Sequence, residues 1–412
     1  MKARKKVVTA SDVRTAGKGG KGGKVEKTRR TPTVRTFKSV IVPVSRSDGR
    51  ISGANGSNGK PAVESGPAAI ADLGSRDVRR ITAAERAALD RVDVSVSLAP
   101  KHGGLRLANP ILVASGTFGY GVEYGEVVDV ERLGAICCKG TTLRPRAGNP
   151  PPRVTETPGG MLNSIGLQNP GVDAVIERYA ATWAGWKVPV IVNVAGESIE
   201  DYVGVARKLD GVPGIAGIEL NISCPNVGKG GLQFAIDRDA ARAVTAAVRK
   251  ATDLPLLVKL SPNVADVRPI AVAIEEAGAD AITAINTLSG LAVAPDRTRA
   301  FLGNTFGGLS GPAVKPVALR VVYEVAQVVS IPIVAIGGIT SLDDVLDFFA
   351  CGAVAVQVGT AIFADPELPV RLADELRAEC LRRGLDSYAP LIGTALPKRA
   401  QQASAKGVEY RP

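Results

Sequence analysis

Short apolar runs alternate with helical segments along the chain from about residue 105 onward. The runs are "ILVAS" (111–115), "AICCKG" (135–140), "VIVNVA" (190–195), "IELNIS" (218–223), "LLVKLS" (256–261), "AITAIN" (281–286), "IVAIGG" (333–338) and "AVQVGT" (355–360). Their continuous apolarity is typical of strands covered on both faces, as in a parallel sheet. Helical segments such as 237–251 and 267–278 separate most of them. Eight such units predict an α/β fold, an eight-stranded parallel (β/α)8 TIM barrel. A doubly wound sheet more often uses fewer strands, and no G-x-G-x-x-G turn follows the first run.

The segment before the first run predicts where folding begins. Residues 82–92 favour a helix, with Thr82 and Glu85 spaced as a capping box. Residues 94–98 alternate in polarity and are followed by residues 105–110, which together predict a hairpin. Residues 1–80 are rich in Gly, Ser and Lys, so we expect a disordered basic extension there. The predicted domains are therefore the extension (1–80), a (β/α)8 barrel (81–395) and a C-terminal tail (396–412).

Charge changes the picture only in the extension. Residues 1–50 carry 15 Lys and Arg against 3 Asp and Glu, a net of +12, so the total of +11 leaves −1 for the rest of the chain. The extension resembles an organellar transit peptide in composition. The alternatives are a solvated tail that binds nucleic acid non-specifically and an inert tail. Aromatic content of 4% without basic–aromatic interleaving argues against specific nucleic-acid binding.

Cysteine and histidine usage limits the possible chemistry. The five cysteines form no C-x-x-C pair and are odd in number, which favours a reducing, cytoplasmic setting. Because His102 is the sole histidine, a multi-histidine metal site is impossible and we expect no metal. No apolar run approaches the ~20 residues of a membrane-spanning helix, so we expect no membrane association.

Polar residues or glycine end each predicted strand. They are Ser115, Lys139 with Gly140, Asn193, Asn221 with Cys224, Lys259, Asn286 with Thr287, Gly337 with Gly338, and Gly359 with Thr360. Taken singly, a buried Asn can bond backbone and a Lys can snorkel to solvent. Because strand C-termini meet at one barrel mouth, their convergence favours a ligand site. The glycines after the last two strands favour a phosphate cradle of backbone N–H groups, although tight turns also need glycine.

The thiol in "NISCPN" (221–226) has two interpretations. Cys224 is either a small core residue or a chemically active group. Its position at a strand end, between Asn221 and Asn226, favours the active group.

The combination of motifs resembles the catalytic subunit of the dihydroorotate dehydrogenase family. The similarity runs from about residue 94 to residue 385. It rests on "NPILVASGTFGYG" (109–121), "KGTTLRPRAGNPPPR" (139–153), "NSIGLQNPG" (163–171), "ELNISCPNV" (219–227), "VKLSPN" (258–263), "INTLSG" (285–290), "GGLSGPAVKP" (307–316), "AIGGI" (335–339) and "VQVGTA" (356–361).

The resemblance implies FMN-dependent oxidation of (S)-dihydroorotate to orotate in pyrimidine (UMP) biosynthesis, with Cys224 as the catalytic base. It implies that the cofactor is bound by Ser115, Lys139, Gly140, Asn193, Asn221, Lys259, Ile285, Gly311, Gly337, Gly338, Gly359 and Thr360. It implies that the substrate is bound by Lys139, Asn163, Ser164, Ile165, Gly166, Leu167, Asn221, Asn226, Asn286 and Thr287.

The electron acceptor divides this family. The cysteine at the base position resembles the soluble members, since membrane-bound members have serine there, and residues 226–239 and 306–325 resemble the NAD-linked kind of soluble member, class 1 type 1B. In that kind a partner subunit carries FAD and a [2Fe–2S] cluster, and we expect a heterotetramer with such a subunit. The alternatives are a fumarate-linked class 1A enzyme and a flavin barrel like that of dihydropyrimidine dehydrogenase.

Overall fold

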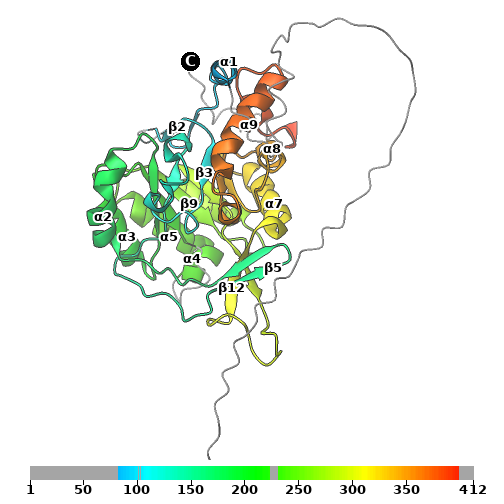
Figure 1. Ribbon diagram of the computed structural model, residues 1–412. Coiled ribbons are helices and arrows are strands. Elements are labelled where there is room, and N and C mark those ends of the chain that lie inside the picture. The colour runs from blue at the N-terminus through cyan, green and yellow to red at the C-terminus, as the bar shows by residue number, and fades with distance from the viewer. Residues whose placement is uncertain (1–81, 101, 103, 223–230, 399–412) are drawn as a thin grey trace, which may run out of the picture. The chain divides into compact units, whose positions relative to one another are not determined.

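Eight parallel strands close into a barrel in the computed structural model, which describes residues 82–100, 102, 104–222 and 231–398 (Figure 1). The strands are β3 (Ile111–Val113), β4 (Ile136–Cys137), β7 (Val190–Val194), β8 (Gly217–Asn221), β9 (Leu256–Leu260), β10 (Ala281–Ala284), β13 (Ile333–Ile336) and β14 (Ala355–Val358). They pair in chain order, and β14 pairs with β3 to close the barrel. All eight apolar runs are therefore barrel strands, and the predicted fold is confirmed.

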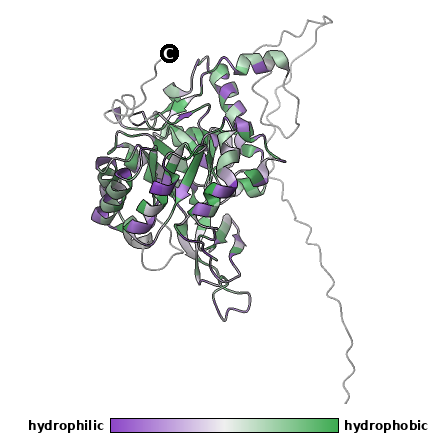
Figure 2. Cartoon of the chain, turned by 90° about the vertical axis from the view of Figure 1, so that its left-hand side faces the viewer, coloured by the Kyte–Doolittle hydropathy of each residue, from purple (hydrophilic) through white to green (hydrophobic). Residues whose placement is uncertain are grey.

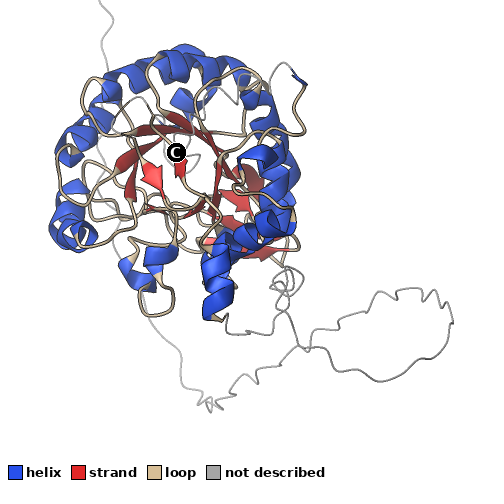
Figure 3. Cartoon of the chain, turned by 90° about the horizontal axis from the view of Figure 1, so that it is seen from above, coloured by secondary structure: helices blue, strands red, loops and turns tan. Residues whose placement is uncertain are grey.

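Helices surround the strands in a ring, which is plain when the barrel is viewed from above (Figure 3). They are α2 (Val172–Ala184), α3 (Ile199–Leu209), α4 (Gly231–Ile236), α5 (Arg238–Arg249), α6 (Arg268–Glu276), α7 (Lys315–Ala326), α8 (Leu342–Ala350) and α9 (Leu368–Arg382). Several begin at side-chain caps: Ser198 accepts from Asp201 N–H at the start of α3, and Asp237 accepts from Ala240 N–H at the start of α5. Such caps satisfy backbone donors that a helix leaves unpaired.

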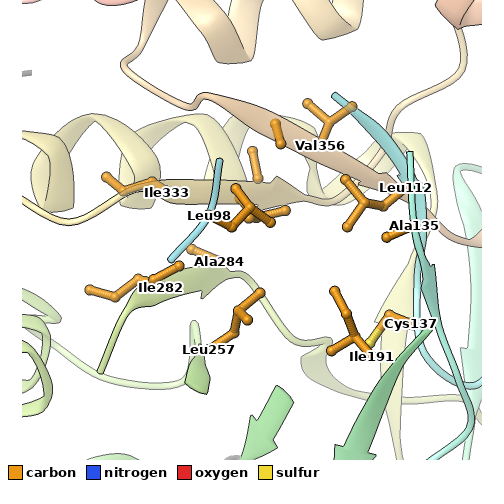
Figure 4. Packing of buried hydrophobic residues seen from close by; sticks show 14 of the residues in the cluster. Leu98, Leu112, Ala135, Cys137, Ile191, Leu257, Ile282, Ala284, Ile333 and Val356 are labelled. Carbon is orange, nitrogen blue, oxygen red and sulfur yellow. The ribbon is translucent and has the colours of Figure 1, made fainter. Parts of the chain in front are cut away.

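The core lies inside the barrel and between its strands and the helices. Every residue of β7, β8 and β9 is buried, as expected for strands covered on both faces. Side chains of neighbouring strands, such as Cys137 and Ile191, lie next to each other in this core (Figure 4). Hydrophobic residues concentrate on the strands and hydrophilic ones on the outer helix faces (Figure 2).

Two connections differ from a plain strand–helix repeat. Between β3 and β4, residues 114–135 form the short 3-10 helices η2 (Val122–Tyr124) and η3 (Val130–Arg132). A second sheet, which the apolar runs do not predict, is antiparallel in the order β11–β12–β6–β5. Its strands are β5 (Val154–Thr157), β6 (Gly160–Asn163), β11 (Leu288–Leu291) and β12 (Phe306–Ser310). They come from the connections that follow β4 and β10.

The expected helix and hairpin precede the barrel. Helix α1 spans Ala83–Leu89, and β1 (Val96–Ser97) pairs with β2 (Arg106–Leu107) in antiparallel fashion. Leu98, which follows β1, lies among the core side chains of the barrel strands (Figure 4). The hairpin and the antiparallel sheet lie at opposite ends of the barrel (Figure 1).

An ion-pair cluster ties α1 to α9. Asp374 on α9 accepts from Arg86 on α1 at 2.8 Å and from Arg132 at 2.5 Å. Burial raises the pKa of Asp374, but the hydrogen bond from Arg86 and the charge of Arg132 outweigh it and bring the pKa below its ordinary value. The carboxylate is therefore charged at neutral pH and holds both arginines.

The structure does not describe residues 1–81, 101, 103, 223–230 and 399–412. The predicted extension (1–80) and most of the tail (396–412) lie outside the described residues, so these domain boundaries stay predictions. Within the described part of the chain, no helix is both long enough and apolar enough to cross a membrane. The remaining described elements are the 3-10 helices η4 (Pro312–Val314), η5 (Thr360–Phe363) and η6 (Ala389–Leu391).

Candidate active site

A cavity of about 600 Å³ opens at the C-terminal ends of the barrel strands. Of the site residues predicted from the sequence, its lining includes Ser115, Lys139, Gly140, Asn163, Ile165, Gly166, Leu167, Asn193, Asn221, Lys259, Ile285, Asn286, Thr287, Gly311, Gly337, Gly338, Gly359 and Thr360. Residues separated by up to 245 positions, from Ser115 to Thr360, thus meet in one place. The described polar strand ends therefore line one cavity.

Of the predicted site residues that the structure describes, Ser164 alone is not part of that lining. Ser164 is fully buried beside the cavity, where its hydroxyl oxygen accepts from the Asn149 amide at 3.3 Å. Its neighbours Asn163 and Ile165 line the cavity, because the side chains alternate along this extended segment. Cys224 and Asn226 lie outside the described residues.

Lys259 brings a buried positive charge to the floor of the cavity. Its side chain is 5% exposed, and its ammonium group donates to the Ser115 hydroxyl at 3.2 Å and to Glu219 Oε1 at 3.3 Å. β9 and the end of β3 lie on opposite sides of the closed barrel, so the contact with Ser115 crosses the barrel mouth. The ammonium group is held at the centre of the floor.

Three asparagine amides continue from the same carboxylate across the floor. Asn193 Nδ2 donates to Glu219 Oε1 at 2.7 Å, which directs its carbonyl oxygen toward Asn221. Asn221 Nδ2 donates to that oxygen at 3.4 Å, and Asn286 Nδ2 donates to Asn221 Oδ1 at 3.3 Å. The last two contacts are at the long end of the hydrogen-bond range. Each amide donates through its nitrogen and accepts through its oxygen. The three hydrogen bonds therefore all run in the same direction, from Asn286 through Asn221 and Asn193 to Glu219.

Glu219 and Gln357 also belong to this network, although neither is among the site residues predicted from the sequence. Both are fully buried, and Gln357 Nε2 donates to Glu219 Oε2 at 2.8 Å. Burial raises the pKa of Glu219, but the charge of Lys259 and the hydrogen bonds of Gln357 and Asn193 bring it below its ordinary value. The available signal was a charged residue inside the apolar run "IELNIS" and a polar one inside "AVQVGT". Such residues are costly to bury without partners.

Glycines form one end of the cavity, after β12, β13 and β14. Gly311 and Gly338 have positive φ values of 97° and 75°, which favour glycine. A Cβ on Gly338 would lie 2.8 Å from Lys315 Cβ and 3.0 Å from Gly311 O, so the backbones approach closely here. The hydroxyl of Thr360, at the start of η5, donates to the Ser310 hydroxyl at 2.7 Å. Backbone and hydroxyl groups therefore form this end of the site.

The lysine beside this glycine end is already paired. Lys315, the first residue of α7, donates to Asp344 at 2.5 Å and to Asp347 at 2.7 Å. Asp344 Oδ2 also accepts from Thr340 N–H and from Ser341 N–H. These contacts hold together the loop that follows β13 and the start of α8.

The opposite part of the cavity presents the amides of Asn163 and Asn286, the hydroxyl of Thr287 and a second lysine, Lys139. Burial is the main cause that lowers the pKa of Lys139, which is half-buried at the end of β4. Asn163 on β6 donates to Gly308 O at 3.4 Å, and Asn286 Oδ1 accepts from Thr287 N–H at 2.8 Å. The antiparallel sheet thus forms one wall here and supports several of the predicted substrate residues.

The site as a whole offers hydrogen-bond partners to a polar ligand that carries an anionic group at one end. Asn and Lys side chains offer donors and acceptors to a heteroaromatic ring, and the glycine end offers backbone N–H groups to a phosphate. Among the residues that the structure describes, no group of three or more His, Cys, Asp or Glu could hold a metal ion. The fold and the cavity together define a (β/α)8-barrel protein with its ligand site at the usual C-terminal mouth.

Comparison with known families identifies the chain more closely. Residues 97–380 match the family described as "Dihydroorotate dehydrogenase", and the chain belongs to this family of oxidoreductases. The match covers both the barrel and the antiparallel sheet. The family that the sequence motifs predict is therefore confirmed.

Curated relatives agree with this assignment. A protein of Citrifermentans bemidjiense is 51% identical over 305 residues, which cover 74% of this chain and 99% of that protein. A protein of Desulforudis audaxviator is 49% identical over 305 residues, which cover 74% of this chain and 98% of that protein. A protein of Geotalea uraniireducens is 49% identical over 308 residues, with 75% and 100% coverage. Each is named "Dihydroorotate dehydrogenase B (NAD(+)), catalytic subunit".

Proposed function

We propose that this chain oxidises (S)-dihydroorotate to orotate in pyrimidine biosynthesis, with FMN bound in the cavity. The observation that carries the proposal is the cavity itself, in a chain that belongs to this family. At one end it combines a glycine cradle with hydroxyl groups, and on its floor it combines amides with a paired lysine. A nucleotide-like cofactor and a small anionic pyrimidine need these two kinds of environment.

The chemistry of the lining residues fits FMN. The glycine end, with Gly337, Gly338 and Thr360, suits the phosphate, because backbone N–H groups and a hydroxyl can surround it there. Lys315 is held by two carboxylates, so backbone and hydroxyl donors are the groups that would hold the phosphate. The other residues proposed to contact the cofactor are Ser115, Lys139, Gly140, Asn193, Asn221, Lys259, Ile285, Gly311 and Gly359.

The substrate would occupy the amide-rich part of the cavity. Amides of Asn163, Asn221 and Asn286 can donate to ring carbonyls and accept from ring N–H groups. Lys139 supplies a positive charge that suits the carboxylate of dihydroorotate. The other residues proposed to contact the substrate are Ser164, Ile165, Gly166, Leu167, Asn226 and Thr287.

The reaction needs a proton acceptor as well as a hydride acceptor. FMN, when bound, supplies the hydride acceptor for the hydrogen on substrate C6. We propose that Cys224 removes the proton from C5. It follows Asn221 by three residues in the sequence, and Asn221 lies on the cavity floor. A thiol has a reference pKa of ~8.5, so a base at this position is available near neutral pH if its surroundings favour the thiolate.

The electrons would then pass to NAD through a partner subunit. The relatives' names combine NAD(+) with the term "catalytic subunit". None of the five cysteines of this chain stands in a C-x-x-C pair, so we propose that FAD and a [2Fe–2S] cluster are carried by the partner, in a heterotetramer. The cytoplasmic location suggested by the cysteine usage stays a prediction.

The test combines spectroscopy with a choice of acceptors. The purified full-length chain should show flavin absorbance, and iron–sulfur absorbance should appear only after co-expression with the partner subunit. NADH should form from dihydroorotate only with the partner present. Efficient fumarate reduction by the chain alone would instead indicate the class 1A enzyme. Protein that stays colourless after incubation with FMN would refute the cofactor proposal.

A further inference from the structure

Glu219 is a buried carboxylate that the proposed reaction does not use directly. It lies beneath the cavity floor on β8 and has an exposure of 0%, and it is not itself part of the cavity lining. Its carboxylate accepts from Lys259, Asn193 and Gln357, which come from β9, β7 and β14. β14 lies opposite β8 in the closed barrel, so the bond from Gln357 crosses the barrel interior.

The directions of these bonds follow from the carboxylate. A charged carboxylate only accepts hydrogen bonds, so Asn193 and Gln357 must both point their amino groups toward it. Among the residues that the structure describes, Gln357 Oε1 has no hydrogen-bond donor. That buried oxygen is left without a donor while the amino group of the same amide meets Glu219. The carboxylate therefore decides the orientation of the surrounding amides.

The same carboxylate fixes the cation above it. Lys259 is 5% exposed, and a buried ammonium group is costly unless it is paired. Among the described residues, Ser115 and Glu219 accept from two of its three N–H donors. The third donor is available to a group in the cavity. The paired charges leave the floor with no net charge but place the positive partner nearer to the ligand.

We propose that Glu219 is a positioning residue that sets the electrostatic environment of the cofactor, by holding the Lys259 ammonium group and the Asn193 amide at the cavity floor. This inference rests on the proposed function, because it requires the flavin to lie above that floor. Added positive charge beside a flavin favours its reduced form, and added negative charge favours its oxidised form. Glu219 thus lowers the reduction potential that an unpaired Lys259 would produce.

The experiment compares the reduction potential of bound FMN in three proteins, measured by anaerobic titration against a reference dye. Glu219→Gln leaves a net positive floor, and its potential should rise above that of the unchanged protein. The double variant Glu219→Gln/Lys259→Met removes both charges, and its potential should fall below that of the unchanged protein. Relative to the unchanged protein, we expect each variant to change the ratio of the affinities for reduced and oxidised flavin by on the order of tenfold. For a two-electron couple this corresponds to about 30 mV.

A matched control separates this role from a structural one. Asp280, just before β10, is also a buried carboxylate, 1% exposed and paired with Arg249 at 3.0 Å, but it is not part of the cavity lining. Asp280→Asn should lower the thermal unfolding temperature while leaving the flavin potential unchanged. The double variant at the floor should unfold close to the temperature of the unchanged protein, since replacing both members of a buried pair is often neutral. It therefore remains measurable if Glu219→Gln folds poorly.

The outcomes distinguish the two proposals. Potentials in the order Glu219→Gln, unchanged protein, double variant, from high to low, would support the inference. A double variant with the same potential as the unchanged protein would overturn it while leaving the proposed function intact. An unchanged protein that does not bind FMN would overturn both.

Discussion

Replacing Gly338 by alanine tests whether the glycine end of the cavity holds the cofactor phosphate. Gly338 follows β13 and has a φ of 75°, a region in which an L-residue costs about 1–2 kcal/mol. The added Cβ would lie 2.8 Å from Lys315 Cβ and 3.0 Å from both Lys315 N and Gly311 O. Two of these three contacts are with backbone atoms, so the loops after β12 and β13 must move apart.

The two costs affect different measurements. The backbone cost is the same with and without cofactor, so it lowers stability but leaves the affinity for FMN unchanged. The displaced loops lie where the phosphate would bind, and displacement weakens hydrogen bonds to a charged group, each worth about 1.5–3 kcal/mol. We therefore expect roughly a ten- to hundredfold loss of FMN affinity, since 1.4 kcal/mol corresponds to a factor of ten.

Gly384 provides a matched control for the backbone cost. It has a φ of 69°, and a Cβ there would meet nothing within 4 Å. It follows α9 and is not part of the cavity lining. Titration of apoprotein with FMN, followed by flavin fluorescence, should give unchanged affinity for Gly384→Ala and weakened affinity for Gly338→Ala. Equal affinity in both variants would refute the assignment of the phosphate to this end.

Three further predictions concern the base, the substrate amides and the fold. Cys224→Ser should retain FMN, but dihydroorotate should reduce the bound flavin much more slowly near pH 7. The residual rate should rise with pH, because the pKa of a hydroxyl lies far above the ~8.5 of a thiol. Stopped-flow rates of flavin reduction like those of the unchanged protein would exclude Cys224 as the base. Asn286→Ala should raise KM for dihydroorotate by roughly tenfold with unchanged flavin content; an unchanged KM would remove Asn286 from the substrate site. Asp374→Asn should lower the free energy of unfolding by about 2 kcal/mol at pH 7. Because the folded pKa of Asp374 lies below its ordinary 3.8, this difference should be complete above about pH 4 and disappear as the pH falls further, as measured by urea unfolding; a difference that does not depend on pH would contradict the ion-pair explanation.

The barrel could be predicted because its signal is local. Each strand is a continuous apolar run, and the residues that end the runs must share one face of a parallel barrel. The antiparallel sheet could not be predicted in the same way. β12 contains Gly307 and Gly308, and its partner β6 pairs Asn163 with Gly308, 145 positions away. A short, glycine-containing strand whose pairing depends on distant residues gives little local pattern.

The residues of the candidate site also differ in how far a local pattern predicts them. Lys259 and Asn221 were predicted because polar residues at the ends of apolar strands are unusual. Glu219 is equally unusual in its run, but its partners lie 40 and 138 positions away at Lys259 and Gln357. Only the closed barrel brings these groups together, so the partners of Glu219 could not be identified from the sequence.

Anaerobic reduction of the purified full-length chain by (S)-dihydroorotate tests the central claim most directly. The visible flavin absorbance should disappear within a single turnover and orotate should form in an amount equal to the bound FMN. Dihydrouracil, which lacks the carboxylate, serves as the comparison substrate and should reduce the flavin far more slowly. Full bleaching by dihydroorotate with little by dihydrouracil is the predicted result. Flavin that remains oxidised with dihydroorotate, or that is reduced preferentially by dihydrouracil, would contradict the account.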